Sequence, residues 1–338
     1  MTSPAQGPPG RVPDFFIVGH PKCGTTALYE MLRRHPQIYM PERKEPRFFS
    51  TDLPSPFQPR PSGAPGETRE DYLALFAAAT PEQLVGEAST AYIWSHTAPA
   101  LIAQAQPGAR IIVILREPAD FVRSLHLQLL QHRSEEVASL RRAIELEDER
   151  RQGRELPSVN ANWPQVLMYS ERARYVDQLR RFHAVFPAEQ VLVLVYDDFR
   201  NDNEGTVRTV ERFLGVDDTL PIEVLEANPT VRRRVGLDET VRNLAYGRGP
   251  VVRRLRRAVK LVTPARLRSE ALQLIRGRMI YGRPKSPDEA FMLELRRRFK
   301  PEVEALSEYL GRDLVSLWGY GDAAPADVKP QRRSPASP

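Results

Sequence analysis

Several features that many proteins share are scarce in this chain of 338 residues. Cys23 is its single cysteine, so no intramolecular disulfide can form, as is typical of a reducing compartment. The longest apolar runs, such as 111–115, are far too short to cross a bilayer. Residues 1–12 are polar and rich in Pro and Gly, without the apolar core of a signal peptide. We therefore expect a cytoplasmic protein with one domain at 13–320 between disordered tails at 1–12 and 321–338.

Acidic residues are scarce in one segment only. Residues 231–283 contain 15 Lys and Arg against 3 Asp and Glu, a net charge of +12, whereas the whole chain carries +6. Because the basicity is local, it argues against a nucleic-acid-binding protein. Cationic and apolar positions mix at 251–260. This pattern predicts peripheral contact with an anionic membrane or binding of a lipid or acidic acceptor, and the alternative is a solvated helix whose Arg stems cover apolar surface. The sequence also lacks Cys and His at metal-ligand spacing, so no metal site is expected.

Short apolar runs alternate with helical patterns along most of the chain. The runs at 14–19, 84–88, 109–115 and 190–196 have the length and composition of buried parallel strands. Helices are expected at 25–34, 69–78, 97–104, 118–133, 169–186, 204–214 and 287–310. This alternation predicts an α/β fold of the P-loop-like, three-layer kind, with a central parallel sheet flanked by helices.

Three further segments are interpreted by composition. The strongly charged stretch 137–154 predicts a solvated surface helix, and 156–164 predicts a loop whose Trp163 lines a cleft. Residues 238–279 form a basic helical pattern that Pro264 interrupts. In a doubly wound sheet, ligands bind at the carboxyl ends of the strands, so the expected site lies there.

The stretch from Phe15 to Thr26 predicts a strand, a Gly-bounded loop and the start of a helix. Its spacing from Gly19 to Gly24 nearly fits the phosphate-binding pattern G-x-x-x-x-G-K-[ST]. Thr25 stands where that pattern has Lys, and the only Lys of the loop is Lys22. Unpaired amides and the dipole at a helix start bind anions, so the loop predicts a phosphate cradle that serves a different transferred group.

The strand at 109–115 ends in Arg116, where a metal-dependent nucleotide hydrolase would carry an Asp. A cation at this position argues for a second anion that the protein binds directly, with a hydrogen bond from Ser124 in the following helix. The alternative is a surface Arg at a strand end. Two phosphate sites on adjacent strands imply a nucleotide with phosphates at both ends.

At this point the chain resembles the sulfotransferases that use 3′-phosphoadenosine 5′-phosphosulfate (PAPS), of bacterial type and similar to the glycan and heparan sulfate branch. Four blocks carry the resemblance, in order: the loop at 21–26, Lys-Glu-Pro-Arg-Phe-Phe at 44–49, Leu-Arg-Glu-Pro at 115–118 with Ser124, and the pattern from 299 to Trp318. Together they span about 14–318.

The resemblance implies metal-free, in-line transfer of a sulfuryl group from PAPS to a hydroxyl, or secondarily to an amine, which leaves adenosine 3′,5′-bisphosphate (PAP). The acceptor would be a small molecule, a lipid or a carbohydrate. Lys22 would neutralise the leaving group, and Glu45 would act as the carboxylate base. His20 is the alternative base, and pairing with Lys44 or Arg47 is the alternative role of Glu45. The implied donor-binding residues are Lys22, Cys23, Gly24, Thr25, Thr26, Arg116, Ser124 and Arg233. The implied residues of the acceptor cleft are Arg47, Glu87, Tyr92 and Trp163.

Three positions depart from the family's pattern. Ala88 replaces a Lys that glycan-type enzymes often carry, Ser50 replaces an Asp, and Ala27 replaces an adenine-stacking aromatic. These changes leave the acceptor class open. Two other functions also stay open, a non-catalytic nucleotide- or membrane-binding protein of the same fold and a nucleotide-dependent kinase, although Thr25 and Arg116 argue against the kinase.

Overall fold

The structure, a computed structural model, describes residues 11–53, 68–161, 163–224, 232–233, 281–282 and 288–321. Over these ranges a five-stranded parallel sheet has the strand order β2-β3-β1-β4-β5. Its strands are β1 (Phe15–Gly19), β2 (Ile38–Tyr39), β3 (Leu84–Ala88), β4 (Arg110–Leu115) and β5 (Val191–Val195). The predicted parallel sheet is confirmed, and β1 lies at its centre between β3 and β4.

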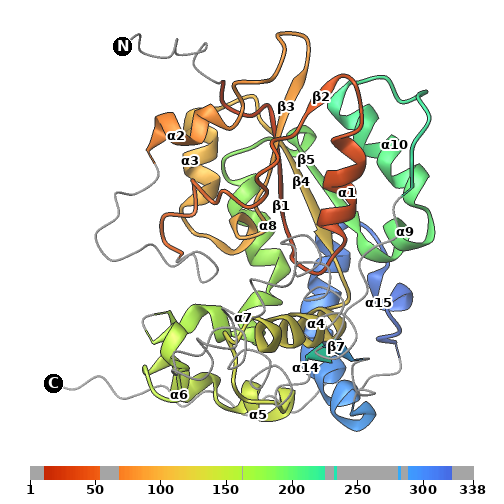
Figure 1. Ribbon diagram of the computed structural model, residues 1–338. Helices are drawn as coiled ribbons and strands as arrows, with labels where there is room; N and C mark the ends of the chain where they lie inside the picture. The colour runs from red at the N-terminus through yellow and green to blue at the C-terminus, as the bar shows by residue number, and fades with distance from the viewer. Residues whose placement is uncertain are drawn as a thin grey trace, which may run out of the picture.

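Helices cover both faces of this sheet (Figure 1). In the view of Figure 1, α1 and α10 lie on one side and α2 and α3 on the other, while α4 to α7 and α14 form a second group beyond the carboxyl end of β1. The α-helices are α1 (Thr25–Leu32), α2 (Arg69–Ala74), α3 (Ala98–Ala105), α4 (Pro118–Gln131), α5 (Leu140–Glu145), α6 (Glu147–Arg151), α7 (Tyr169–Arg172), α8 (Tyr175–His183), α9 (Tyr196–Asn201), α10 (Asn203–Leu214), α14 (Glu289–Leu310) and α15 (Leu314–Leu317). Short 3-10 turns are η1 (Tyr92–Trp94), η2 (Ser158–Asn160), η3 (Pro164–Leu167) and η4 (Ala188–Gln190).

The central strands are buried because both faces of the sheet are covered. Every residue of β1 is buried, and so is every residue of β4 after Arg110. Continuous apolar runs such as Phe-Phe-Ile-Val are the composition that a parallel sheet of this kind requires. The sheet therefore holds the carboxyl ends of β1, β3 and β4 side by side.

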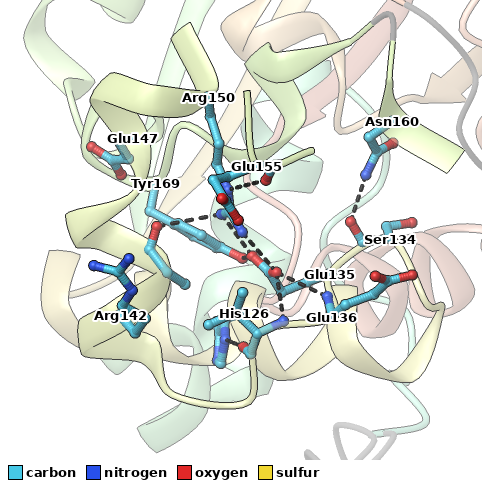
Figure 2. Close-up of polar contacts among 12 residues, drawn as sticks. His126, Ser134, Glu135, Glu136, Arg142, Glu147, Arg150, Glu155, Asn160 and Tyr169 are labelled. Carbon is cyan, nitrogen blue, oxygen red and sulfur yellow. Dashed lines mark hydrogen bonds and ion pairs between the residues drawn. The ribbon is translucent and has the colours of Figure 1, made fainter. Parts of the chain in front are cut away.

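The charged stretch 137–154 is not a solvated helix, and this expectation is wrong. It forms two short helices, α5 and α6, and Arg150 of α6 has no exposed side-chain surface. Its guanidinium donates to both carboxylate oxygens of Glu135, at 2.8 and 2.9 Å, and the Tyr169 hydroxyl donates to the same carboxylate at 2.9 Å (Figure 2). A buried ion pair thus anchors a segment whose charges had indicated a solvent-facing helix.

The C-terminal segment packs against the strand ends. Trp318 donates from its indole nitrogen to the carboxylate of Asp197, two residues after the end of β5, at 3.0 Å. The Tyr320 hydroxyl donates to the carboxylate of Glu117, two residues after the end of β4. Glu117 in turn caps α4 by accepting from two amides of its first turn. The late sequence block is therefore part of the same folded unit as the sheet.

Several expectations fall outside the described residues. These are the predicted helix at 238–279 and the predicted membrane contact of 231–283. Within 231–283 the structure describes only an antiparallel strand pair, β6 (Arg232–Arg233) and β7 (Tyr281–Gly282). The tails and the cytoplasmic location stay predictions. Among the helices that the structure describes, none combines the length and apolarity that crossing a bilayer would need.

Candidate active site

The loop between β1 and α1 ends at Gly24, which adopts a left-handed conformation with φ of +85°. A Cβ atom there would lie 2.8 Å from the ring of Phe199, so both the backbone and the space demand glycine. The next residue, Thr25, begins α1, and no side chain caps the first turn of this helix. The first amides of α1 therefore remain available to an anion, as the loop pattern predicted.

Lys22 and Arg116 come together at the carboxyl ends of the adjacent strands β1 and β4. Arg116 donates from Nη1 to the backbone carbonyl of Lys22 at 3.3 Å, and its guanidinium lies 5.0 Å from the centre of the Tyr196 ring. Its other terminal nitrogen lies 3.6 Å from the Asp120 carboxylate. Burial and the charge of Arg116 together lower the pKa of Lys22. A bound anion would relieve this repulsion between two cations.

The two further donor-site predictions lie on or beside α4. Ser124 is buried on that helix, which starts two residues after Arg116. The backbone of β6, which contains Arg233, lies within contact distance of α4. The structure thus places the chain at Arg233 beside the helix that carries Ser124, but the Arg233 side chain is outside what the structure describes.

His20 and Cys23 are buried residues of the loop. Burial raises the pKa of the Cys23 thiol to about 12, so the thiol stays protonated at neutral pH. His20 is fully buried, and its Nε2 lies 2.5 Å from Oε1 of Gln178. Burial, and then the charge of Arg172, lower the pKa of His20 to about 3. Both residues are neutral parts of the loop's packing in this arrangement.

Glu45 lies directly beside the end of β3, where its amide donates to the carbonyl of Ala88 at 3.0 Å. One carboxylate oxygen accepts from the Thr90 hydroxyl at 2.9 Å and from Lys44 at 3.1 Å. The other oxygen accepts from the Thr90 amide at 3.0 Å and from Arg47 at 3.4 Å. About a quarter of the side chain, 24%, is exposed.

The surroundings of Glu45 favour its charged form. Burial acts to raise the pKa of this carboxyl, but the charges of Lys44 and Arg47 and the Thr90 hydroxyl outweigh burial and hold the pKa below its usual value. Glu45 is therefore ionised at neutral pH. The predicted pairing with Lys44 and Arg47 exists, and the side chain is only partly exposed.

Glu87 and Tyr92 do not line a cleft, contrary to the sequence-based interpretation. Neither residue has exposed surface. The Glu87 carboxylate accepts from the hydroxyls of Tyr72 at 2.8 Å and Tyr92 at 2.9 Å, inside the core. Burial raises the pKa of Glu87 to about 7. By contrast, Trp163 is 38% exposed, so its place at a surface cleft stays a prediction.

Arg172, which ends α7, was not among the site residues predicted from the sequence. Its guanidinium lies 3.9 Å from the centre of the Trp94 ring, and the residue is only 6% exposed. Burial, and then the charge of Arg47, lower the pKa of Arg172 to about 9. Within the described ranges, Arg172 makes no ion pair. No sequence signal separates this arginine from the many surface cations of the helical pattern at 169–186.

The strand, loop and helix around Gly24, with an arginine at the end of the neighbouring parallel strand, define a P-loop-like α/β protein. The model of the Sulfotransferase family matches residues 13–219, and the chain belongs to this family.

Solved and curated relatives agree with this assignment. A crystal structure of a sulfotransferase from Alicyclobacillus acidocaldarius is 27% identical, with a TM-score of 0.61, and the match covers 91% of this chain and 99% of that one. Carbohydrate sulfotransferase 15 of Mus musculus is 28% identical over 249 residues, which cover 61% of this chain and 44% of that protein. Bifunctional heparan sulfate N-deacetylase/N-sulfotransferase 3 of Homo sapiens is 29% identical over 223 residues, covering 61% of this chain and 22% of that protein. The chain thus spans less than half the length of these two curated relatives.

Proposed function

We propose that the protein transfers a sulfuryl group from PAPS to a hydroxyl group of an acceptor, or secondarily to an amine, and releases PAP. The convergence of Lys22 and Arg116 at the ends of β1 and β4 carries this proposal, because the Arg116 guanidinium lies 3.3 Å from the Lys22 carbonyl. Membership of the sulfotransferase family gives the reaction class. The donor and the residue roles are the proposed part.

The residues present fit a donor with phosphates at both ends. Lys22, Thr25, Thr26 and the uncapped amides of α1 would hold the 5′-phosphosulfate end. Arg116, Ser124 and Arg233 would hold the 3′-phosphate. When bound, the donor supplies an activated sulfuryl group attached to a phosphate leaving group. The Lys22 ammonium would neutralise the negative charge that develops on the leaving oxygen.

Glu45 is the proposed base. A base must lie within hydrogen-bond reach of the proton that it removes, and Glu45 is both ionised and partly exposed. Its contact with Arg47 is the longest of its four, at 3.4 Å, so the acceptor hydroxyl would approach that oxygen. His20 is the weaker candidate because it has no exposed surface.

We extend the proposal to a glycan acceptor, with small molecules and lipids as the other classes. Its support is the names of the similar proteins, which are carbohydrate and heparan sulfate sulfotransferases. Trp163, with 38% of its surface exposed, offers a flat apolar face of the kind that packs on sugar rings.

Thermal unfolding with added nucleotide tests the donor. A ligand bound only by the native state at 100 times its Kd adds about 2.7 kcal/mol, which raises the midpoint of a chain this long by about 4 °C. We expect that rise with PAP and none with Mg-ATP. The reverse pattern would indicate a kinase and overturn the proposal.

Two variants then separate chemistry from binding. Glu45→Gln should lower sulfate transfer from labelled PAPS to chondroitin or heparosan oligosaccharides by roughly 10²- to 10⁴-fold, with PAP binding unchanged. Lys22→Ala should lower transfer and also weaken PAP binding, because Lys22 faces the leaving group. The matched control is Glu42→Gln, since that side chain is 93% exposed. Full turnover by Glu45→Gln would rule out the carboxylate base and direct attention to His20.

A further inference from the structure

Arg172 is a buried cation that the proposed donor site does not use. Its side chain leaves the end of α7 and lies over the Trp94 ring at 3.9 Å. Only 6% of the residue is exposed to solvent. Its Nε atom is buried and has no hydrogen-bond partner among the described residues. Its two terminal nitrogens are not among the buried atoms that lack a partner. A buried guanidinium without an acid partner is costly, so its retention needs an explanation.

Two more unpaired nitrogens lie in the same region. His20 Nδ1 and Arg181 Nε are also buried without a hydrogen-bond partner among the described residues. Gln178 accepts from His20 and donates to the backbone carbonyl of Arg172 at 3.1 Å. Arg181 donates to the carbonyl of Ile93, the residue before Trp94, at 3.2 Å, so the three residues share one region. His20 donates from Nε2 to Gln178, so its Nδ1 is an acceptor, whereas the two arginine Nε atoms are donors. Within the described ranges no acid pairs with Arg172, although a purely structural buried arginine would require one.

The position of Arg172 assigns it to the acceptor side of the site. It packs on Trp94 of η1, which follows β3, whereas Arg116 follows β4 on the opposite side of β1. Arg47 lies against the same segment after β3, where its amide donates to the Ser89 hydroxyl at 3.0 Å, and its charge lowers the pKa of Arg172. Arg47 also pairs with the proposed base Glu45 at 3.4 Å. Lys22 instead responds to the charge of Arg116. Two cationic groups therefore lie on different sides of the central strand.

We propose that the Arg172 guanidinium, with Arg47 beside it, binds an acidic group of the acceptor, a carboxylate or a sulfate. This inference rests on the proposed function and narrows it to anionic acceptors. It also connects acceptor binding to the base. An acidic group between the two arginines competes with Glu45 for Arg47, and loss of that contact frees the carboxylate oxygen that would accept the proton.

Binding of three tetrasaccharides to the PAP-saturated protein tests the inference by calorimetry. Unsulfated chondroitin carries carboxylates, 6-O-sulfated chitotetraose carries sulfates, and chitotetraose is the neutral reference. The wild type should bind at least one acidic probe about 10- to 100-fold more tightly than the neutral one, the range for a charge-assisted hydrogen bond. The acidic probe that binds more tightly identifies the acidic group as a carboxylate or a sulfate.

Variants at Arg172 then assign the preference. Arg172→Met should reduce the ratio of acidic-probe to neutral-probe affinity to no more than about threefold, while the affinity for PAP stays unchanged. Arg172→Lys should keep part of the preference for the acidic probe. Arg174→Met is the matched control, because this neighbouring arginine is 63% exposed and pairs with Asp177 on its own helix. The control should keep the full preference.

Each contrary result has a distinct meaning. A wild type that prefers neither acidic probe, or that binds neither at about 1 mM, overturns the inference without any variant. A preference that survives in a folded Arg172→Met also overturns it, and so does a tenfold loss of PAP affinity, which would move Arg172 to the donor site. If the wild type does not bind PAP, the proposed function fails, and the inference fails with it.

Discussion

Replacing Arg150 with methionine tests how the segment 135–169 is held in place. The guanidinium and the Glu135 carboxylate have no exposed side-chain surface, and the two parallel contacts at 2.8 and 2.9 Å form a bidentate pair (Figure 2). Methionine keeps most of the side-chain length but removes the charge, which leaves the Glu135 carboxylate buried beside only the hydroxyl of Tyr169 and backbone amides. That carboxylate then bears the full cost of desolvation.

The expected loss is large. Removing one partner of a buried ion pair costs about 3–5 kcal/mol. For a chain of 338 residues the unfolding entropy is roughly 0.7 kcal/mol per kelvin, so the unfolding midpoint should fall by about 4–7 °C. The double variant Glu135→Gln with Arg150→Met removes both charges and should recover at least about 1 kcal/mol of that loss, since Gln still accepts from Tyr169.

Thermal unfolding followed by circular dichroism measures these effects. The control is Arg151→Met, the next residue, whose side chain is 49% exposed and pairs with Asp148 and Glu171 at the surface. An exposed pair contributes at most about 1 kcal/mol, so this midpoint should move by no more than about 1–2 °C. Equal losses at 150 and 151, or a double variant less stable than Arg150→Met, would refute the reasoning.

Two further changes probe the loop and the core. Gly24→Ala should destabilise the protein by more than Gly153→Ala and should weaken PAP binding. Both glycines have positive φ, of +85° and +80°, but only the Cβ at 24 meets Phe199, at 2.8 Å. Backbone strain alone costs about 1–2 kcal/mol, so equal midpoints for the two variants would contradict a steric role for Gly24. The second change is in the core, at Glu87, whose pKa is raised from 4.5 to about 7. The contribution of this carboxyl to stability is therefore complete below about pH 4.5 and is lost as the pH rises through 7. Glu87→Gln should therefore be more stable than the wild type at about pH 8, by up to about 3 kcal/mol, and the difference should vanish near pH 4.5; urea unfolding at the two pH values measures it, and a difference independent of pH would refute the assignment.

The strands could be predicted from the sequence because burial on both faces leaves a continuous apolar run. The runs at 14–19 and 84–88 correspond to β1 and β3 within one residue. The strand β2 has only two residues, Ile38–Tyr39, which is too short for any pattern to indicate. Its pairing with β3 depends on the tertiary fold.

The break in the predicted helix at 169–186 has a tertiary cause. Arg174 leaves the helical conformation, with ψ of 73°, and Gln178 donates from its side chain to the carbonyl of Arg172 at 3.1 Å. The same Gln178 contacts His20 at 2.5 Å, so the break joins α7 and α8 to the loop. Periodicity records neither contact, because both partners lie on different elements.

The anion loop could be predicted in more detail than the acceptor side. Lys22, Gly24 and Thr25 are close in sequence, and local spacing determines their geometry. Arg172 lies about 150 residues from the loop, and only packing brings its charge to His20. Likewise, a count of charges cannot separate the buried Arg150 from the exposed Arg151.

The electrostatics of the site favour Glu45 over His20 as the proposed base. Burial, and then the charges of Arg172 and Arg181, oppose a proton on His20 and lower its pKa to about 3. Glu45 faces Lys44 and Arg47, so the pKa of its carboxyl is also lowered, and it is a weak base toward a free hydroxyl. The acceptor hydroxyl, however, becomes acidic as its oxygen bonds to sulfur, and a weak base suffices at that point. An ionised Glu45 that accepts the proton late, after Arg47 has turned to an acidic group of the acceptor, satisfies both the charge balance and the geometry of the site.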